Sequence, residues 1–336
     1  MKRIHYIYLL SAATLATLIG CSSDESSTVP APSTPKVEIR LGSNVLAVPQ
    51  QGRSVVSEGQ YLTTMLIGRE GKTAGEASQA WTASGSFYAH ATTGQEIAIA
   101  PKQYYSDTQD THTYILGVYP TGTLQGDKVV FTRSDGEQDV MLSAWTDAGT
   151  KASNTPAADQ AVSPTAETVH TLTFDHKTAQ VYFLAKAGTN DNGDLFSEPA
   201  YVESITLRNA QVPSEVNLTA PSVTFATPAD LSIPGIPSVG LTDQPTNCGN
   251  PVMVNESAQL VVDIVLNVGG SPILFQGITL KDEANPGANL VTTIGKRHKV
   301  TLTFTAPNDD LEGAVKINAT ATVNNWEDGN SGSIIL

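Results

Sequence analysis

Apolar residues recur at every second position in short segments along most of the chain, and this period of two constrains the fold more than any other feature. Near the start, Val37, Ile39 and Leu41 alternate with charged residues. Successive side chains of a β-strand point to opposite faces, so such segments are typical of strands with one buried face. Turns are supplied by 27 Gly and 19 Pro residues, and long helical repeats of Leu, Lys and Glu are absent. We predict an all-β fold.

Several segments carry this alternation or a short apolar run. The run Leu260–Leu266 (LVVDIVL) predicts a central buried strand, and Asp135-Gly136 is a hairpin signal between two expected strands. The expected strands are 37–41, 114–119, 128–131, 139–144, 171–174, 179–185, 202–207, 260–266, 299–305 and 315–323.

The chain is long enough for two domains. Residues 150–168 are rich in Ala, Thr, Ser and Pro and show little periodicity, which is typical of a linker or a long surface loop. We therefore expect an N-terminal β-sandwich domain over residues 37–165 and a C-terminal one over residues 166–336, both built from antiparallel strands.

The N-terminus has the pattern of a lipoprotein signal peptide. Lys2 and Arg3 precede an apolar stretch too short to span a bilayer, which ends in Leu18-Ile19-Gly20-Cys21. We expect residues 1–20 to be removed and Cys21 to be acylated, followed by a flexible tether over residues 21–36. The alternative is an ordinary secretory signal with an incidental cysteine. The acidic Ser23-Asp24-Glu25 resembles the export tether of surface lipoproteins, although a periplasmic location stays open.

Charge and cysteine content exclude several partners. The net charge of −14 disfavours binding to nucleic acid and to anionic headgroups. If Cys21 is lipidated, Cys248 has no partner in the chain, so we expect a buried, unreactive thiol and no disulfide.

The sequence lacks the motifs of common enzymes and metal sites. It contains neither His-Glu-x-x-His nor Gly-x-Ser-x-Gly, and its histidines are scattered. Asn190–Asp194 (NDNGD) has oxygen ligands for calcium, but a tight turn explains the same residues. Asp263, the acidic residue within the run Leu260–Leu266, is expected to lie at an edge or to face outward. We predict no enzymatic activity, no cofactor and no metal site.

Besides the lipobox and the first strand VEIRL, four blocks stand out in order along the chain: YILGVYP (114–120), DVMLSAW (139–145), TLTFDHKTAQVYFLA (171–185), and GKRHKVTLTF (295–304) with VKINATATVNNWEDG (315–329). Together they resemble the fimbrillin family, the type V pilins and Mfa-like fimbrial lipoproteins. The departure is His298, where relatives often have tyrosine, and we expect only a changed edge contact there.

The resemblance implies two tandem transthyretin-like β-sandwich domains and a subunit of a surface fimbria. In such relatives an Arg- or Lys-specific protease removes the lipidated N-terminus with the first strand, and a strand from the next subunit replaces it. Carried onto this chain, cleavage falls between Arg53 and Ser54, in preference to Arg40 or Arg69; an ordinary surface arginine is the alternative for Arg53. Residues 331–336 (SGSIIL) are either the donor strand or the last native strand.

Other functions stay open at this stage. Stalk, tip and anchor roles are not distinguished, and the adhesion ligand is unknown. The main alternative is a glycan-binding outer-membrane lipoprotein that keeps its lipid anchor, which clustered exposed tryptophans would favour. A β-sandwich enzyme would need paired carboxylates on facing strands.

Overall fold

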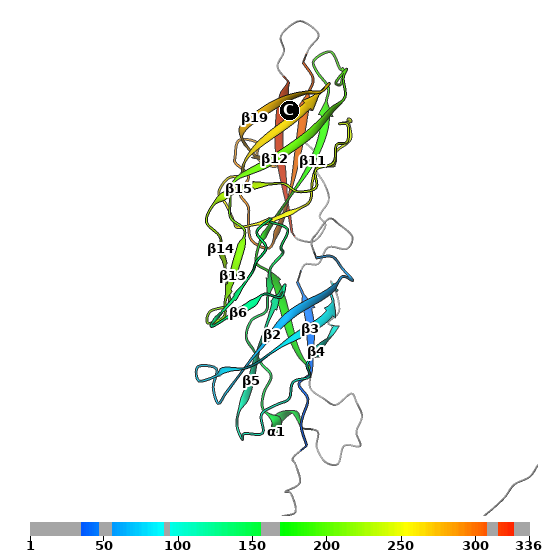
Figure 1. Cartoon of the computed structure of the whole chain (residues 1–336). Coiled ribbons are helices and arrows are strands. Elements are labelled where there is room, and N and C mark those ends of the chain that lie inside the picture. Colours follow the sequence, from blue (N-terminus) through cyan, green and yellow to red (C-terminus); the bar gives the residue numbers. More distant parts are fainter. Residues whose placement is uncertain (1–34, 47–55, 91–94, 156–168, 308–314, 326–336) are drawn as a thin grey trace, which may run out of the picture. The chain divides into compact units, whose positions relative to one another are not determined.

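The computed structural model describes residues 35–46, 56–90, 95–155, 169–307 and 315–325 (Figure 1). This part of the chain is almost entirely β-structure, with one short helix, α1 (Lys151–Asn154). None of its helices is long and apolar enough to cross a membrane. The strands are β1 (Leu41–Val45), β2 (Tyr61–Gly71), β3 (Ser78–Tyr88), β4 (Gln95–Ala100), β5 (His112–Tyr119), β6 (Thr123–Gln125), β7 (Lys128–Val130), β8 (Met141–Leu142), β9 (Thr146–Asp147), β10 (His170–His176), β11 (Ala179–Gly188), β12 (Ala200–Ala210), β13 (Pro213–Asn217), β14 (Ser222–Phe225), β15 (Ala229–Ser232), β16 (Thr246–Asn247), β17 (Val252–Val254), β18 (Val261–Val268), β19 (Ser271–Thr279), β20 (Lys281–Asp282), β21 (Lys296–Thr305) and β22 (Lys316–Asn325).

The first sheet closes on itself. Its strand order is β2-β3-β4-β1-β10-β8-β5-β9, and β2 also pairs with β5. Seven strands therefore form a continuous ring of ladders, with β9 outside it on β5. A closed ring has no free strand edge, which is the usual protection against unwanted strand pairing. Its interior is packed with apolar side chains from all around the ring, including Leu62, Phe87 and Phe174.

Two further sheets enclose a second core. The six-stranded sheet has the order β16-β11-β21-β22-β20 with β17 also on β11, and the four-stranded sheet has the order β15-β12-β18-β19. Alternate residues of β11 and β21, such as Phe183 and Phe304, pack against those of β18, such as Ile264. The all-β sandwich prediction is confirmed, and so is the central position of Leu260–Leu266, which lies between β12 and β19 as β18.

A fourth sheet, β14-β13-β7-β6, joins strands far apart in sequence, because β7 pairs with β13. This pairing shows that the hairpin prediction at Asp135-Gly136 is wrong. A turn is present, with Gly136 at φ +77°, but β7 and β8 on either side of it pair with different strands. The turn signal was local, whereas the pairing is decided by the burial of Val129 and Val216 in a common cluster.

The structure bears on two expected boundaries, the start of the first strand and the division between the two domains. The first strand begins at Leu41 rather than Val37, and residues 37–39 reach the sheet through a single bridge between Glu38 and Tyr104. β10 lies beyond the expected boundary at residue 165 but pairs with β1 and β8 in the first sheet. The division at 165/166 remains a prediction.

Candidate functional site

The place of β1 in the ring is the feature with the clearest functional meaning. We call the position that Val37–Val45 occupies between β4 and β10 the first-strand slot. β1 pairs in parallel with β10 over five residues, from Leu41 opposite His170 to Val45 opposite Phe174. On its other side it pairs antiparallel with β4 over three residues, Leu41 to Ser43. The first strand of the chain is thus central, and both of its neighbours depend on it for backbone hydrogen bonds.

Side chains of this segment complete the core of the ring. Ile39, Leu41 and Val45 retain 1%, 0% and 2% of their accessible surface, and all three pack in the same cluster as Phe174. Ser43, also buried, donates its hydroxyl to the carbonyl of Gln95 at 3.1 Å. The alternation seen in the sequence therefore aims every second residue inward, as predicted, and the slot without this segment would be an open apolar groove.

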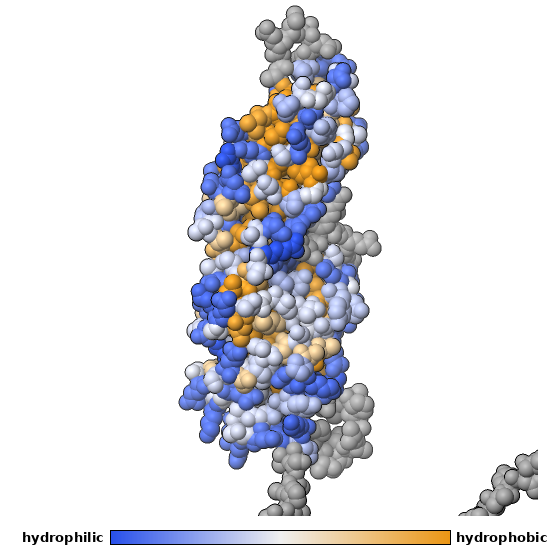
Figure 2. Space-filling model, in the orientation of Figure 1, coloured by the Kyte–Doolittle hydropathy of each residue, from blue (hydrophilic) through white to orange (hydrophobic). Residues whose placement is uncertain are grey.

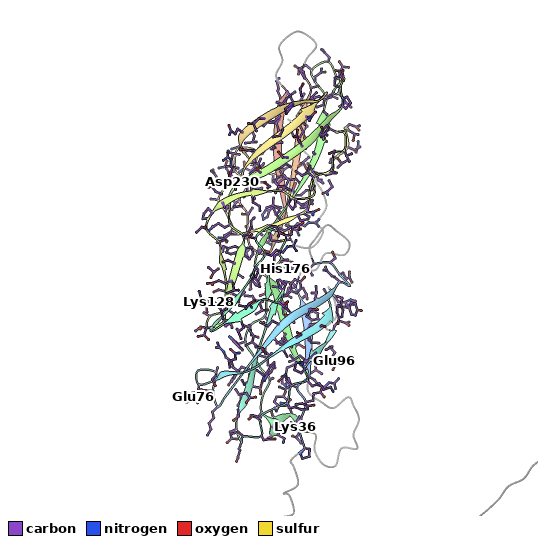
Figure 3. The ribbon with its side chains drawn as sticks, viewed as in Figure 1. Lys36, Glu76, Glu96, Lys128, His176 and Asp230 are labelled. Atoms are coloured by element: carbon purple, nitrogen blue, oxygen red, sulfur yellow. The ribbon has the colours of Figure 1, made fainter. Side chains whose placement is uncertain are left out.

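The opposite face of the segment makes ion pairs at the protein surface. Arg40 lies 2.9 Å from Glu96 of β4, which is labelled in Figure 3, and Lys102 lies 2.7 Å from Glu38. Exposed pairs of this kind contribute little free energy. The register of the segment is set by its apolar face, because a shift by one residue would turn these side chains outward, and it would also separate both ion pairs.

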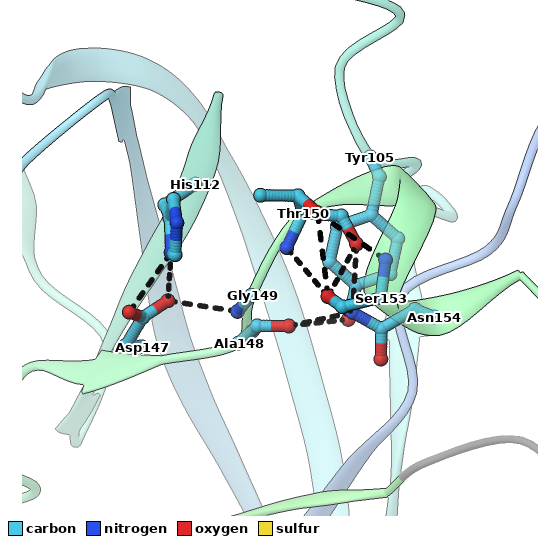
Figure 4. A network of polar contacts seen from close by, with 8 residues as sticks. All are labelled: Tyr105, His112, Asp147, Ala148, Gly149, Thr150, Ser153 and Asn154. Carbon is cyan, nitrogen blue, oxygen red and sulfur yellow. Dashed lines mark hydrogen bonds and ion pairs between the residues drawn. The ribbon is translucent and has the colours of Figure 1, made fainter. Parts of the chain in front are cut away.

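A polar network holds one end of the slot without help from β1 (Figure 4). The hydroxyl of Tyr105 and the amide nitrogen of Asn154 both donate to the carbonyl of Ala148, at 3.0 and 2.9 Å. Thr150 caps α1 through a capping box with Ser153. Asn154 Oδ1 lies 3.1 Å from His170 Nε2, so α1 anchors the first residue of β10.

Burial lowers the pKa of His170 in this network, which favours the neutral imidazole over the charged form. A neutral ring can donate its Nε2 proton to the amide oxygen of Asn154, as the 3.1 Å separation requires. The first residue of β10 is therefore held by a side-chain contact with α1 in addition to its ladder with β1.

The predicted cleavage and lipidation residues lie outside the described part of the chain. These are Arg53, Ser54 and Cys21, together with the candidate donor segment 331–336. Arg40 and Arg69 are described, and each is engaged. Arg40 pairs with Glu96, and Arg69 lies within β2 with its guanidinium 4.5 Å from the ring centre of Trp145. A protease needs an extended, accessible segment, so both residues fit cleavage poorly.

Three residues considered for chemistry have structural roles. Asp263 lies on β18 and forms an ion pair with Arg208, which lowers the pKa of its carboxyl. Asn190 accepts hydrogen bonds from two backbone N–H groups of its own loop, so this loop is a turn. Burial raises the pKa of the Cys248 thiol to about 12. Within the residues that the structure describes, no three His, Cys, Asp or Glu side chains converge on a metal site.

The position of His298 in the structure differs from the predicted one. It lies on β21 between β11 and β22 and is fully buried, so the prediction of an edge contact is wrong. Its Nε2 accepts a hydrogen bond from the backbone N–H of Thr293 at 3.1 Å. Desolvation lowers its pKa to about 4, which keeps the ring neutral.

Sequence reasoning missed the C-terminal half of the first strand. Ser43 interrupts the apolar inward face after Leu41, yet Val45 continues it. The period of two was still present at Ser43 and Val45, and a small polar residue at the first of these positions concealed it.

The sequence matches a family model, and the fold matches solved structures. A fimbrillin-like family model matches residues 65–326. Among solved structures, a candidate cell adhesion protein from Bacteroides uniformis has a TM-score of 0.53 and 14% identity, covering 88% of this chain and 99% of that one. A second, from Bacteroides ovatus, has a TM-score of 0.52 and 13% identity, covering 88% and 100%. The tip fimbrial protein Mfa3 from Porphyromonas gingivalis has a TM-score of 0.41 and 10% identity, covering 87% and 100%.

No curated protein matches the sequence. At identities of 13–14% the solved structures show a common fold and nothing finer. The family match is broader evidence, because it extends over well more than half of the chain and includes most strands of both cores. The chain belongs to the fimbrillin-like family, a family of fimbrial and adhesion proteins of the cell surface.

Proposed function

We propose that this protein is a subunit of a cell-surface fimbria that assembles by strand exchange at the first-strand slot. It is exported as a lipoprotein acylated on Cys21, and an Arg- or Lys-specific protease cleaves after Arg53. The observation that carries the proposal is that the first strand of the chain, β1, is a member of the closed ring and is paired on both sides, with β4 and β10. β1 and Ile39 just before it supply three core side chains, and the predicted cleavage site at Arg53 comes eight residues after the end of β1.

Loss of the first strand has a defined physical consequence. The ladders of β4 and β10 that faced β1 lose their partners, and the closed ring gains two edges. Unpaired backbone groups next to an apolar groove are costly, so the groove favours an added strand. A strand from another subunit then supplies main-chain hydrogen bonds, and its alternate apolar side chains set the register.

Such an interface is heterologous, since a donor strand on one subunit meets a groove on the next. Interfaces of this type do not close on themselves and propagate a filament. The donor proposed here is the segment 331–336, whose apolar Ile334, Ile335 and Leu336 follow three small or polar residues. A subunit that keeps its N-terminus would have a filled slot and a lipid anchor, which suits an anchor role or a surface lipoprotein that does not polymerise.

N-terminal sequencing of membrane-bound and sheared surface material tests this proposal. The expected result is a membrane form that begins at acylated Cys21 and a polymeric form that begins at Ser54. An Arg53→Ala variant should accumulate the longer form and lose polymers. The matched control is Arg133→Ala, which removes an arginine of 53% side-chain exposure from another loop and should be processed normally. Polymers that still begin at Cys21 would refute cleavage and strand exchange together.

A further inference from the structure

We propose that the outer face of β2, β3 and β4 binds an uncharged oligosaccharide, with Tyr61 and Tyr88 stacking on its sugar rings. This face lies on the side of the strands opposite the core of the ring. The first-strand slot lies within the ring itself, so a ligand on its outer face adds a binding role to the proposed assembly role.

The two tyrosines form an exposed aromatic ledge. Tyr61 and Tyr88 are directly opposite each other in the β2–β3 ladder. Their ring centres are 5.0 Å apart and the planes meet at 62°, an edge-to-face pair. The two residues keep 57% and 51% of their accessible surface exposed. Rings with an apolar face and a polar tip, held rigidly and left open to solvent, are typical of recognition surfaces.

The strands continue this ledge as a floor of small and hydroxyl-bearing side chains. Alternation places every second residue on the outer face, and the register aligns Thr63 with Ser86 and Met65 with Ser84. Ser86 and Ser84 in turn lie opposite Ala98 and Ala100 of β4. Much of the surface over β2 and β3 has the pale colours of intermediate hydropathy in Figure 2.

A shallow depression lies in this floor. It has a volume of about 410 Å³, within the range of ligand sites. Thr63 lines the depression, and it lies two residues after Tyr61 on β2, about 7 Å along the strand. The depression is therefore next to the ledge. The residues around it are Thr63, Met65, Thr82, Ala83, Ser84, Ala100, Pro101 and Thr121.

The chemistry of the face selects the class of ligand. Hydroxyl groups donate and accept hydrogen bonds, and they match the hydroxyl groups of a sugar in both roles. No residue of the ledge or the depression is charged, although the chain carries 52 charged Lys, Arg, Asp and Glu residues. The next outward position of β4 is Glu96, and Arg40 pairs with it at 2.9 Å. An anionic ligand would be repelled by the net charge of −14, and a cationic one finds no free carboxylate on the face.

Saturation-transfer NMR on the purified full-length chain tests the proposal. The probes are neutral oligosaccharides of glucose, galactose, mannose, xylose and N-acetylglucosamine, with a proline-rich peptide as the competing ligand class. We expect at least one oligosaccharide to bind saturably and to receive saturation when the tyrosine protons of the protein are irradiated. Binding of the peptide alone, or of no probe, would overturn the proposal.

Two variants locate the site. Tyr61→Ala combined with Tyr88→Ala should weaken sugar binding by about tenfold or more, because both stacking surfaces are removed. Thr63→Lys should weaken binding by placing a long charged side chain at the edge of the depression while both rings remain. Leu274→Ala is the matched control, since Leu274 is 59% exposed on β19 of another sheet, and it should bind like the wild type. Unchanged sugar binding in both the double tyrosine variant and Thr63→Lys would refute the assignment of the site.

Discussion

Removal of the first strand should bring the protein to the limit of its stability, and a peptide of the same sequence should restore it. The perturbation is a chain that begins at Ser54, with a synthetic peptide of residues 36–46 added in trans. Three side chains, Ile39, Leu41 and Val45, leave the core when this segment is absent. Burial of each contributes about 1.5–3 kcal/mol, so the side chains alone account for about 5–9 kcal/mol.

That loss is comparable with the whole free energy of unfolding of an ordinary domain, about 5–15 kcal/mol. Unpaired hydrogen-bonding groups on β4 and β10 add to it, since eight register pairs join β1 to these two strands. The truncated chain should therefore unfold at a much lower temperature, or without a cooperative transition, when followed by circular dichroism.

Adding the peptide should raise the midpoint in proportion to the logarithm of its concentration, because a ligand that binds only the folded state stabilises it by mass action. A control peptide with Ile39→Lys and Leu41→Lys keeps the backbone but cannot fill the core, and should have no effect. A truncated chain that melts like the full chain and ignores the peptide would show that β1 is not the stabilising element inferred here.

Three further predictions concern single residues. Cys248, with a pKa raised to about 12 by burial, should resist maleimide labelling in the native protein and react on unfolding, as followed by mass spectrometry. His298 has a folded-state pKa of about 4, below its unfolded value near 6.5, so the unfolded state binds more protons and stability should fall as pH drops from 6.5 to 4. The loss is about 3 kcal/mol, and urea unfolding of His298→Gln at both pH values should show a smaller difference than the wild type. Gly68→Ala should lower the melting temperature, because its methyl group would lie 2.0 Å from the ring of Trp81, whereas Gly75→Ala, with no atom within 4 Å, should leave it unchanged.

The sequence predicted the C-terminal core better than the first sheet. Strands such as β11, β18 and β21 have strong apolar contrast between their faces, and each was predicted within a few residues of its limits. β2, β3 and β4 were not predicted, because the two faces contrast little: Thr64 and Gly85 interrupt the inner apolar face, and apolar or aromatic residues such as Met65 lie on the outer one. The surface proposed to bind sugars therefore belongs to strands that periodicity alone does not reveal.

Pairing between distant strands was beyond local patterns altogether. The sequence placed a strand near Leu41 and another at Thr171–Phe174, but not their parallel contact, because register depends on which apolar faces meet across the core. The same contact explains why the proposed exchange is chemically plausible. Removal of β1 opens the ring between β4 and β10, and these two strands leave room for only one strand between them. A replacement strand must therefore have the same alternation of inward apolar and outward polar residues.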